Sequence, residues 1–372
     1  MAFVSGPRQV GKTTLAKSLL QHPENYFNWD QSTFRKIWAT DPSKILDDCN
    51  GGPIVLDEIH KDRRWKQRLK GFYDTLGTES SHPIVVTGSA RLDIFRKGGD
   101  SMLGRYIPFR LHPFTVAESE HPNAPFAQFQ TIPPKIRLQE LLQYGGFPEA
   151  LFGADSKKAE RWSRLRMERL LYEDVRDLSQ IKDLEALRVL CDFLPQRVGS
   201  LLSINNLRQD VGVAYATVRS WVEILSQLYV CFVIRPYTKK LNRMVSTEPK
   251  LFLYDILGID DMSKRLENLT ALHLLKACNF WTDTAKGHFE LFFLRTKDSK
   301  EIDFMITCDK KPWMLVECKS NSKALNPTLI RFRDQLNTPH NIQLVSTGPY
   351  HRHYKEENIH VCDYESLFSQ LV

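Results

Sequence analysis

The chain opens with "MAFVSGPRQVGKTTLAKSLL" (residues 1–20), and this stretch decides the fold of its first part. Gly6 to Thr13 fits the pattern G-x-x-x-x-G-K-[ST], between a short apolar run and a helix-like segment. Strand, loop and helix in this order predict a phosphate-binding loop. Its glycines let the backbone curl so that N–H groups and the helix start face phosphate oxygens. The residues expected around the phosphates are Gly6, Pro7, Arg8, Gln9, Val10, Gly11, Lys12, Thr13 and Thr14.

A second apolar segment, "GGPIVLDEIHK" (residues 51–61), ends its predicted strand in two acids, Asp57 and Glu58. In such sites Asp57 and the Thr13 hydroxyl would hold Mg²⁺, and Lys12 would reach the β- and γ-phosphates. Glu58 would polarise the attacking water. The predicted cofactors are therefore ATP and Mg²⁺.

A third apolar run, "HPIVVTGSA" (residues 82–90), ends in polar residues, and Ser89 among them is placed to sense the γ-phosphate. A glycine turn alone can match the loop pattern by chance. Three strand ends that converge on one site favour a nucleotide site over that alternative.

Composition limits the class of protein. The chain has 372 residues, of which 42% are hydrophobic and 26% charged, which predicts two to three domains. It contains neither an apolar run long enough to cross a bilayer nor a leader pattern, so we expect a cytoplasmic protein without a membrane partner. A net charge of +7 permits a polyanionic partner without requiring one.

Five motifs together resemble the AAA-type ATPases of bacteria and archaea that carry a C-terminal domain of uncharacterised function. They are "GPRQVGKTTL" (6–15), "IVLDEIHK" (54–61), "VVTGSARL" (85–92), "GRYIPFRLHPFT" (104–115) and "YGGFPEAL" (144–151). The resemblance implies a homo-oligomer whose ATP sites lie between subunits and borrow an arginine from the neighbour, for which Arg105 is the candidate. An ordinary surface salt bridge is the alternative for Arg105. Members usually carry a helical segment before the first strand, which this chain lacks, so contacts to the nucleotide base are expected to be missing.

Helical spacing dominates the chain from residue 113 to about residue 199, and this region includes a predicted flexible joint at "AESEHPNAPFAQFQTIPP" (residues 117–134). Two helices follow, near residues 204–211 and 216–225, with a turn at Gly212. An apolar strand and a basic segment behind them predict a winged helix. Its candidate DNA contacts are Thr217, Arg219, Lys239, Lys240 and Arg243. A winged helix that only packs against the ATPase is equally compatible with the pattern.

The last part holds a second cluster of chemically active residues. "KDSKEIDFMITCDKKPWMLVECKSNSK" (residues 297–323) predicts two strands with a turn from Asp309 to Pro312. Alternation puts Glu317 and Lys319 on one face, with Asp303 on the paired strand. This segment resembles the PD-(D/E)xK restriction-endonuclease superfamily, which implies a second Mg²⁺ site to which Glu267 would contribute. The fold also occurs without nuclease activity.

The predicted fold class is α/β. It comprises a P-loop AAA-type core (residues 1–115), a helical lid (116–200), a winged helix (201–262) and a restriction-endonuclease-like α/β domain (263–372). The predicted function is ATP hydrolysis coupled to binding of DNA or a partner. The alternative is an ATP-gated protein-interaction switch without DNA or nuclease activity.

Overall fold

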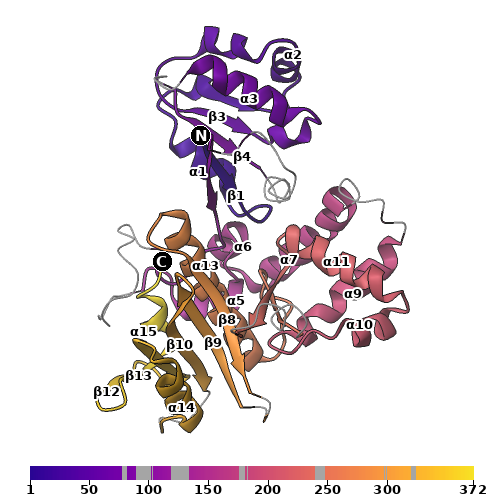
Figure 1. Ribbon diagram of the computed structural model, residues 1–372. Coiled ribbons are helices and arrows are strands. Elements are labelled where there is room, and N and C mark those ends of the chain that lie inside the picture. Colours follow the sequence, from indigo (N-terminus) through magenta and orange to yellow (C-terminus); the bar gives the residue numbers. More distant parts are fainter. Residues whose placement is uncertain are drawn as a thin grey trace. The chain divides into compact units, whose positions relative to one another are not determined.

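The structure is a computed structural model that describes residues 1–77, 82–88, 102, 104–118, 134–175, 181, 183–238, 248–296, 298, 300–319 and 324–372 (Figure 1). These residues form two compact units. The first contains Met1–His112 and Gln227–Tyr229, and the second contains Pro113–Ser226 and Val230–Val372. Within the described ranges, none of the helices combines the length and apolar character that a bilayer span requires.

A parallel sheet of five strands forms the centre of the first unit. In spatial order the strands are β2 (Tyr26–Asn28), β3 (Ile54–Asp57), β4 (Ile84–Thr87), β1 (Ala2–Ser5) and β5 (Ile107–Arg110). Every residue of β3 and β4 is buried, as expected for parallel strands covered on both faces. The three strands expected from the apolar runs are confirmed.

Helices cover this sheet (Figure 1). They are α1 (Lys12–Ser18), α2 (Ser32–Thr40) and α3 (Trp65–Leu76), with 3₁₀ turns at Pro23–Asn25 (η1), Pro42–Asp48 (η2) and Ile59–Lys61 (η3). Trp38 and Phe72 meet edge to face in the core, with ring centroids 5.7 Å apart. At the start of the chain, β1, the loop and α1 follow one another in the order that a phosphate-binding loop requires, so the predicted P-loop arrangement is confirmed.

The second unit begins with helices. They are α5 (Leu138–Tyr144), α6 (Pro148–Gly153), α7 (Ser156–Arg169), a π-helical turn at Leu170–Val175 (η5), α9 (Leu184–Phe193) and a 3₁₀ turn at Leu194–Arg197 (η6). The helix pair expected further on is present as α10 (Ile204–Val211) and α11 (Tyr215–Gln227). Gly212 ends α10 with a φ of 77°, a left-handed conformation that glycine adopts without strain. Most of the predicted joint at residues 117–134 lies outside the described residues.

An eight-stranded sheet follows in the same unit. In spatial order its strands are β12 (His351–Tyr354), β13 (Ile359–Asp363), β11 (His340–Val345), β10 (Lys311–Lys319), β9 (Glu301–Cys308), β8 (Phe289–Arg295), β6 (Cys231–Pro236) and β7 (Lys250–Leu253). Its helices are α13 (Met262–Asp283), α14 (Pro327–Leu336) and α15 (Tyr364–Phe368). Because β6 pairs with both β7 and β8, one sheet continues from the segment before residue 262 into the segment after it.

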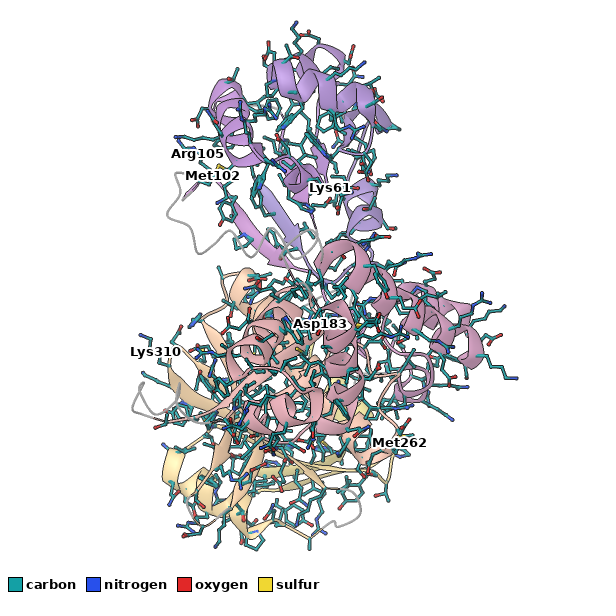
Figure 2. All side chains as sticks on the ribbon, turned by 90° about the vertical axis from the view of Figure 1, so that its right-hand side faces the viewer. Lys61, Met102, Arg105, Asp183, Met262 and Lys310 are labelled. Carbon is teal, nitrogen blue, oxygen red and sulfur yellow. The ribbon has the colours of Figure 1, made fainter. Side chains whose placement is uncertain are left out.

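The predicted hairpin in the last part is β9 and β10, which pair in antiparallel orientation. Its turn is shorter than the sequence suggested, because β10 already begins at Lys311. Asp309 and Lys310 have φ angles of 48° and 66°. Lys310 lies at the tip (Figure 2). Two consecutive residues with positive φ are typical of the tight turns that match the twist of paired strands.

Candidate functional site

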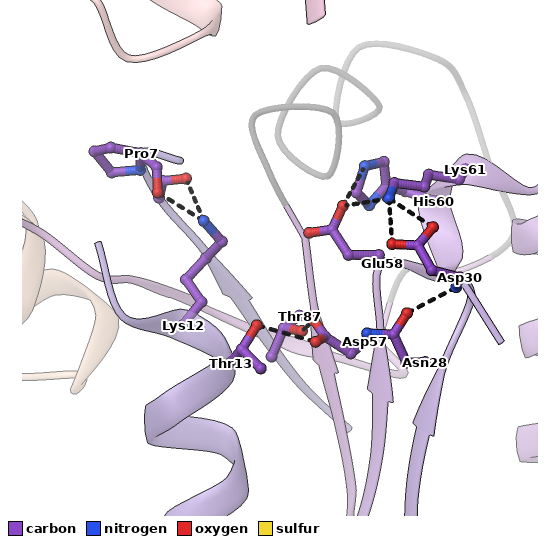
Figure 3. A network of polar contacts seen from close by, with 11 residues as sticks. Pro7, Lys12, Thr13, Asn28, Asp30, Asp57, Glu58, His60, Lys61 and Thr87 are labelled. Atoms are coloured by element: carbon purple, nitrogen blue, oxygen red, sulfur yellow. Dashed lines mark hydrogen bonds and ion pairs between the residues drawn. The ribbon is translucent and has the colours of Figure 1, made fainter. Parts of the chain in front are cut away.

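The phosphate-binding loop follows β1 and has the backbone conformation that its glycines allow. Gly6 and Gly11 have φ angles of 154° and 100°. A Cβ atom at Gly6 would collide with the carbonyl oxygen of Leu111, so this close approach requires glycine. The Lys12 ammonium is buried and donates to the carbonyl oxygens of Gly6 (3.0 Å) and Pro7 (2.7 Å) (Figure 3). The lysine therefore lies against the inner side of the loop.

Asp57 is the centre of a polar network at the end of β3 (Figure 3). The Thr13 hydroxyl donates to its Oδ2 atom at 3.0 Å, and the Tyr26 hydroxyl donates to the same oxygen at 2.7 Å. Thr87, at the end of β4, donates to Oδ1. Burial and the neighbouring carboxylate of Asp57 raise the pKa of Tyr26 to about 12, so its phenol remains a donor near neutral pH. Asp57 and Thr87 are the last residues of β3 and β4, and these two converge because the carboxyl ends of parallel strands lie at the same end of the sheet.

Glu58 follows Asp57 in a left-handed backbone conformation, with a φ of 60°. Its carboxylate lies 3.7 Å from the His60 ring and 3.6 Å from the Lys61 ammonium (Figure 3). Burial raises the pKa of Glu58, while Lys61 and Lys12 oppose this shift. The side chain is still 25% exposed, so a water molecule can reach it. This environment is suitable for a carboxylate that accepts a proton.

These residues fit a magnesium-bound nucleoside triphosphate. A hydroxyl and a carboxylate, both oxygen donors that Mg²⁺ prefers, already lie in hydrogen-bond contact as Thr13 and Asp57. The ammonium of Lys12 lies on the loop itself, where phosphate oxygens would replace the two backbone carbonyls as its acceptors. Ser89, the predicted γ-phosphate sensor, lies outside the described residues.

Within its own chain, Arg105 lies far from the carboxyl-terminal ends of the strands, where Asp57 and the phosphate-binding loop are found. It precedes β5, which runs parallel to β1 with Ala2 beside Ile107. Arg105 therefore lies at the amino-terminal ends of the strands, whereas the loop lies at their carboxyl-terminal ends. Its guanidinium pairs with Asp74 at 3.0 Å, and its backbone N–H donates to Met102 (Figure 2). A role at the phosphates therefore requires a neighbouring subunit.

The surface of α11 that carries the candidate DNA contacts offers less positive charge than the sequence suggested. Arg219 is 66% exposed, but its guanidinium lies 3.5 Å from the carboxylate of Glu223, one turn later on the helix. Thr217 is half-buried. Lys239, Lys240 and Arg243 lie outside the described residues.

The acids of the last part are brought together as alternation predicted. Asp303 on β9 accepts a hydrogen bond from the backbone N–H of Cys318 on β10, at 2.9 Å. Glu317 is buried, and the amide of Asn326 donates to its Oε1 atom at 2.6 Å. Burial, reinforced by Asp303, raises the pKa of Glu317 to about 8. Lys319 is half-buried and opposes this shift.

Sequence reasoning missed the residue at the centre of this cluster, Lys250 on β7. Its ammonium lies 2.6 Å from Glu301, 3.2 Å from Glu267 and 3.6 Å from Asp303. Burial alone lowers the pKa of Lys250, but attraction by the three carboxylates outweighs it and raises the pKa above its ordinary value. Burial raises the pKa of Glu267 to about 7. The available signal was a lysine directly before the apolar run "LFLY" (residues 251–254).

Three families match successive parts of the chain. Residues 1–120 match the family described as "AAA domain". Residues 135–258 match "Domain of unknown function (DUF8612)", and residues 263–367 match "Domain of unknown function (DUF4143)". The matched ranges divide the second unit close to the start of α13.

Similar proteins occur in bacteria and archaea. An uncharacterised protein of Mycobacterium tuberculosis is 23% identical over 336 residues, which cover 84% of this chain and 69% of that protein. An uncharacterised protein of Methanocaldococcus jannaschii is 25% identical over 332 residues, with coverages of 75% and 68%.

Among solved structures, the Thermotoga maritima RuvB Holliday junction branch migration motor aligns at 17% identity, covering 66% of this chain and 87% of that one. Its TM-score is 0.27, which is too low to support a conclusion about this chain. Residues 1–120 are therefore similar to the AAA domain family and carry a P-loop arrangement, and residues 263–367 are similar to the DUF4143 family.

Proposed function

We propose that the first unit binds ATP with Mg²⁺ on residues 6–14 and hydrolyses it. The observation that carries this proposal is the contact of 3.0 Å between the Thr13 hydroxyl and Asp57, at the same sheet edge as the loop that holds Lys12. It joins the two motifs that nucleotide hydrolysis needs, although they are far apart in the sequence.

Each residue of this site has its own role in binding or hydrolysis. Lys12 binds the β- and γ-phosphate oxygens, and Thr13 and Asp57 hold the metal ion, which neutralises phosphate charge when bound. Glu58 orients the attacking water and accepts its proton at a carboxylate oxygen, a role that its raised pKa favours. Lys61 and His60 position that carboxylate. Ser89 is the proposed sensor of the γ-phosphate.

We propose that ATP hydrolysis is coupled to binding of DNA or a partner by the rest of the chain, whose domains span residues 116–200, 201–262 and 263–372. The helix pair α10 and α11, followed by β6 and β7, supports a winged helix that binds DNA through Thr217, Arg219, Lys239, Lys240 and Arg243. Because β6 and β7 share a sheet with β8, the last two of these domains would move as one body.

A protein partner in place of DNA is the second candidate. The ion pair between Arg219 and Glu223 favours it, since the pair reduces the positive charge that α11 offers to phosphates. The position of Lys250 among the acids points the same way, because a filled acidic cluster is a poor catalyst of phosphodiester cleavage. In this case the protein is an ATP-gated interaction switch.

Salt dependence separates the two candidates. If Arg219, Lys239, Lys240 and Arg243 each contact one phosphate of duplex DNA, the logarithm of the binding constant falls with the logarithm of salt concentration at a slope of about −3.6. Fluorescence anisotropy with labelled duplexes measures this slope. The variant Arg219→Ala should reduce its magnitude by about 1, and Glu223→Gln serves as the matched control. Weak binding with a flat salt response, and ATPase activity that DNA does not change, would favour the protein partner.

Arg105 gives a prediction about assembly. If it acts on the ATP site of a neighbouring subunit, ATPase activity per chain rises several-fold as protein concentration drives assembly, and Arg105→Ala removes this rise. Asp74→Asn is the control, because it breaks the same salt bridge but keeps the arginine. Activity should be measured across the assembly range found by sedimentation. Equal effects of both variants would leave Arg105 with a surface salt bridge only.

A further inference from the structure

We propose that α7 presents a basic face that binds the phosphate backbone of duplex DNA without reading its sequence (Figure 1). The basic face consists of the exposed cations Lys157, Lys158, Arg161 and Arg169. This inference rests on the DNA-binding branch of the proposed function, but it uses none of the residues of α11. It adds a second contact to DNA that can be tested separately from the first.

The charges of α7 are sorted by side. At 3.6 residues per turn, the four cations of the basic face fall within about a third of the helix circumference. Both acids of α7, Glu160 and Glu168, instead line a groove that this helix forms with α9, and Arg164 lines the same groove. Because Arg164 lies four residues from each of these acids, its charge is offset. The basic face therefore carries no acid of its own helix.

The positive charge of the basic face is largely unneutralised. Among the described residues, its two arginines form no ion pair. Lys158 is 81% exposed, and its ammonium lies 3.8 Å from the carboxylate of Asp155, a loose surface pair that holds little of its charge. On α11, by contrast, Arg219 pairs with an acid of the same helix. α7 therefore offers phosphate groups more positive charge than α11 does.

The opposite side of α7 fixes the helix in place. Arg166 is 2% exposed, and its guanidinium lies 4.1 Å from the centre of the Phe147 ring and 3.9 Å from the Asp255 carboxylate. The Ser163 hydroxyl donates to the same carboxylate at 2.7 Å. The basic face is therefore held in position before a ligand arrives, which lowers the entropic cost of binding.

A row of phosphates fits the basic face. From Lys157 to Arg169 the face is about 18 Å long at a rise of 1.5 Å per residue. Over that length each strand of a duplex carries about five phosphates, so every cation has an anion within reach. Arginine also binds phosphate through two parallel hydrogen bonds.

The composition of this surface favours DNA over a protein or a membrane. Within α7, all of whose residues the structure describes, Leu165 is the one large apolar side chain that is exposed, at 41%. Protein interfaces have an apolar core that is depleted in lysine, and a helix that lies on a membrane needs a broad apolar face. Neither requirement is met by four cations around a single leucine.

The test is the salt dependence of binding to a labelled duplex of random sequence, measured by fluorescence anisotropy on the full chain. In the double variant Arg161→Ala, Arg169→Ala, the slope of the logarithm of the binding constant against that of salt concentration should shrink by about 1.8, because each phosphate contact contributes about 0.9. At about 0.1 M salt this variant should bind at least about tenfold more weakly than the wild type. Arg164→Ala, on the groove side, is the matched control and should keep both values.

A second double variant, Arg161→Lys, Arg169→Lys, keeps both charges and should keep the slope within about 0.5 of the wild-type value. The three substituted arginines are exposed, so the Tm of each variant should stay within about 3 °C of the wild type. A change in DNA binding then reports on the charges of the basic face rather than on folding.

The contrary outcomes are distinct. If the double alanine variant keeps the wild-type slope while Arg219→Ala reduces it, DNA binds through α11 and this inference is wrong. A loss of equal size in Arg164→Ala also contradicts it, because the effect would not be confined to the basic face. Equal affinity for polyglutamate of the same total charge would point to an acidic protein instead. If the wild type does not bind duplex DNA even at low salt, the DNA-binding branch of the proposed function fails as well.

Discussion

Replacing Glu58 with glutamine will leave ATP binding intact and lower ATP turnover by about 10²- to 10⁴-fold, the usual contribution of a positioned general base. Glutamine has nearly the same size and can still contact Lys61, but it cannot accept the proton of the attacking water. The carboxylate is placed for this task because it is partly exposed and lies among His60 and Lys61 at the edge that carries Asp57. Steady-state phosphate release and binding of a fluorescent nucleotide measure the two quantities separately.

Glu24→Gln is the control for this experiment. Glu24 is an exposed carboxylate of the same unit, with 43% of its side chain accessible, and we expect its substitution to leave turnover unchanged. Turnover in Glu58→Gln within threefold of the wild type would contradict the assignment of Glu58 as the base. Another acceptor would then have to activate the water.

Lys12→Ala will instead weaken ATP binding itself, by about 100-fold, because two charge-assisted hydrogen bonds to phosphate oxygens are lost. The loss is smaller than the gross strength of these bonds, since in the free protein the ammonium already donates to the carbonyls of Gly6 and Pro7. Equilibrium binding of a labelled nucleotide measures the affinity. Thermal unfolding without nucleotide shows whether the unit remains folded.

Lys36→Ala, at an exposed position on α2, is the matched control and should bind ATP as the wild type does. If Lys12→Ala binds nucleotide with unchanged affinity, the loop does not hold phosphates and the proposed function fails. If the variant binds normally but turns over slowly, Lys12 acts only on the transition state. These outcomes are distinct from that of Glu58→Gln, in which binding persists.

Much of the candidate nucleotide-binding site could be predicted from the sequence. The G-x-x-x-x-G-K-[ST] pattern requires local backbone geometry that its own glycines permit, and Gly6 and Gly11 do have positive φ angles. The apolar runs before Asp57 and Thr87 are strands, because fully buried parallel strands read as continuous hydrophobic stretches. Tyr26 was missed because β2 is only three residues long and has no periodicity to read.

The sequence by itself determined the elements whose signal is local, namely the phosphate-binding loop, the helix pair around Gly212 and the hairpin that carries Asp303 and Glu317. Only the tertiary structure decided which distant side chains meet. It placed Arg105 at the sheet edge opposite to the loop and Lys250 within 4 Å of Glu267 and Asp303. The physical reason is that such contacts depend on strand order and on packing between segments, which leave no periodic trace along the chain.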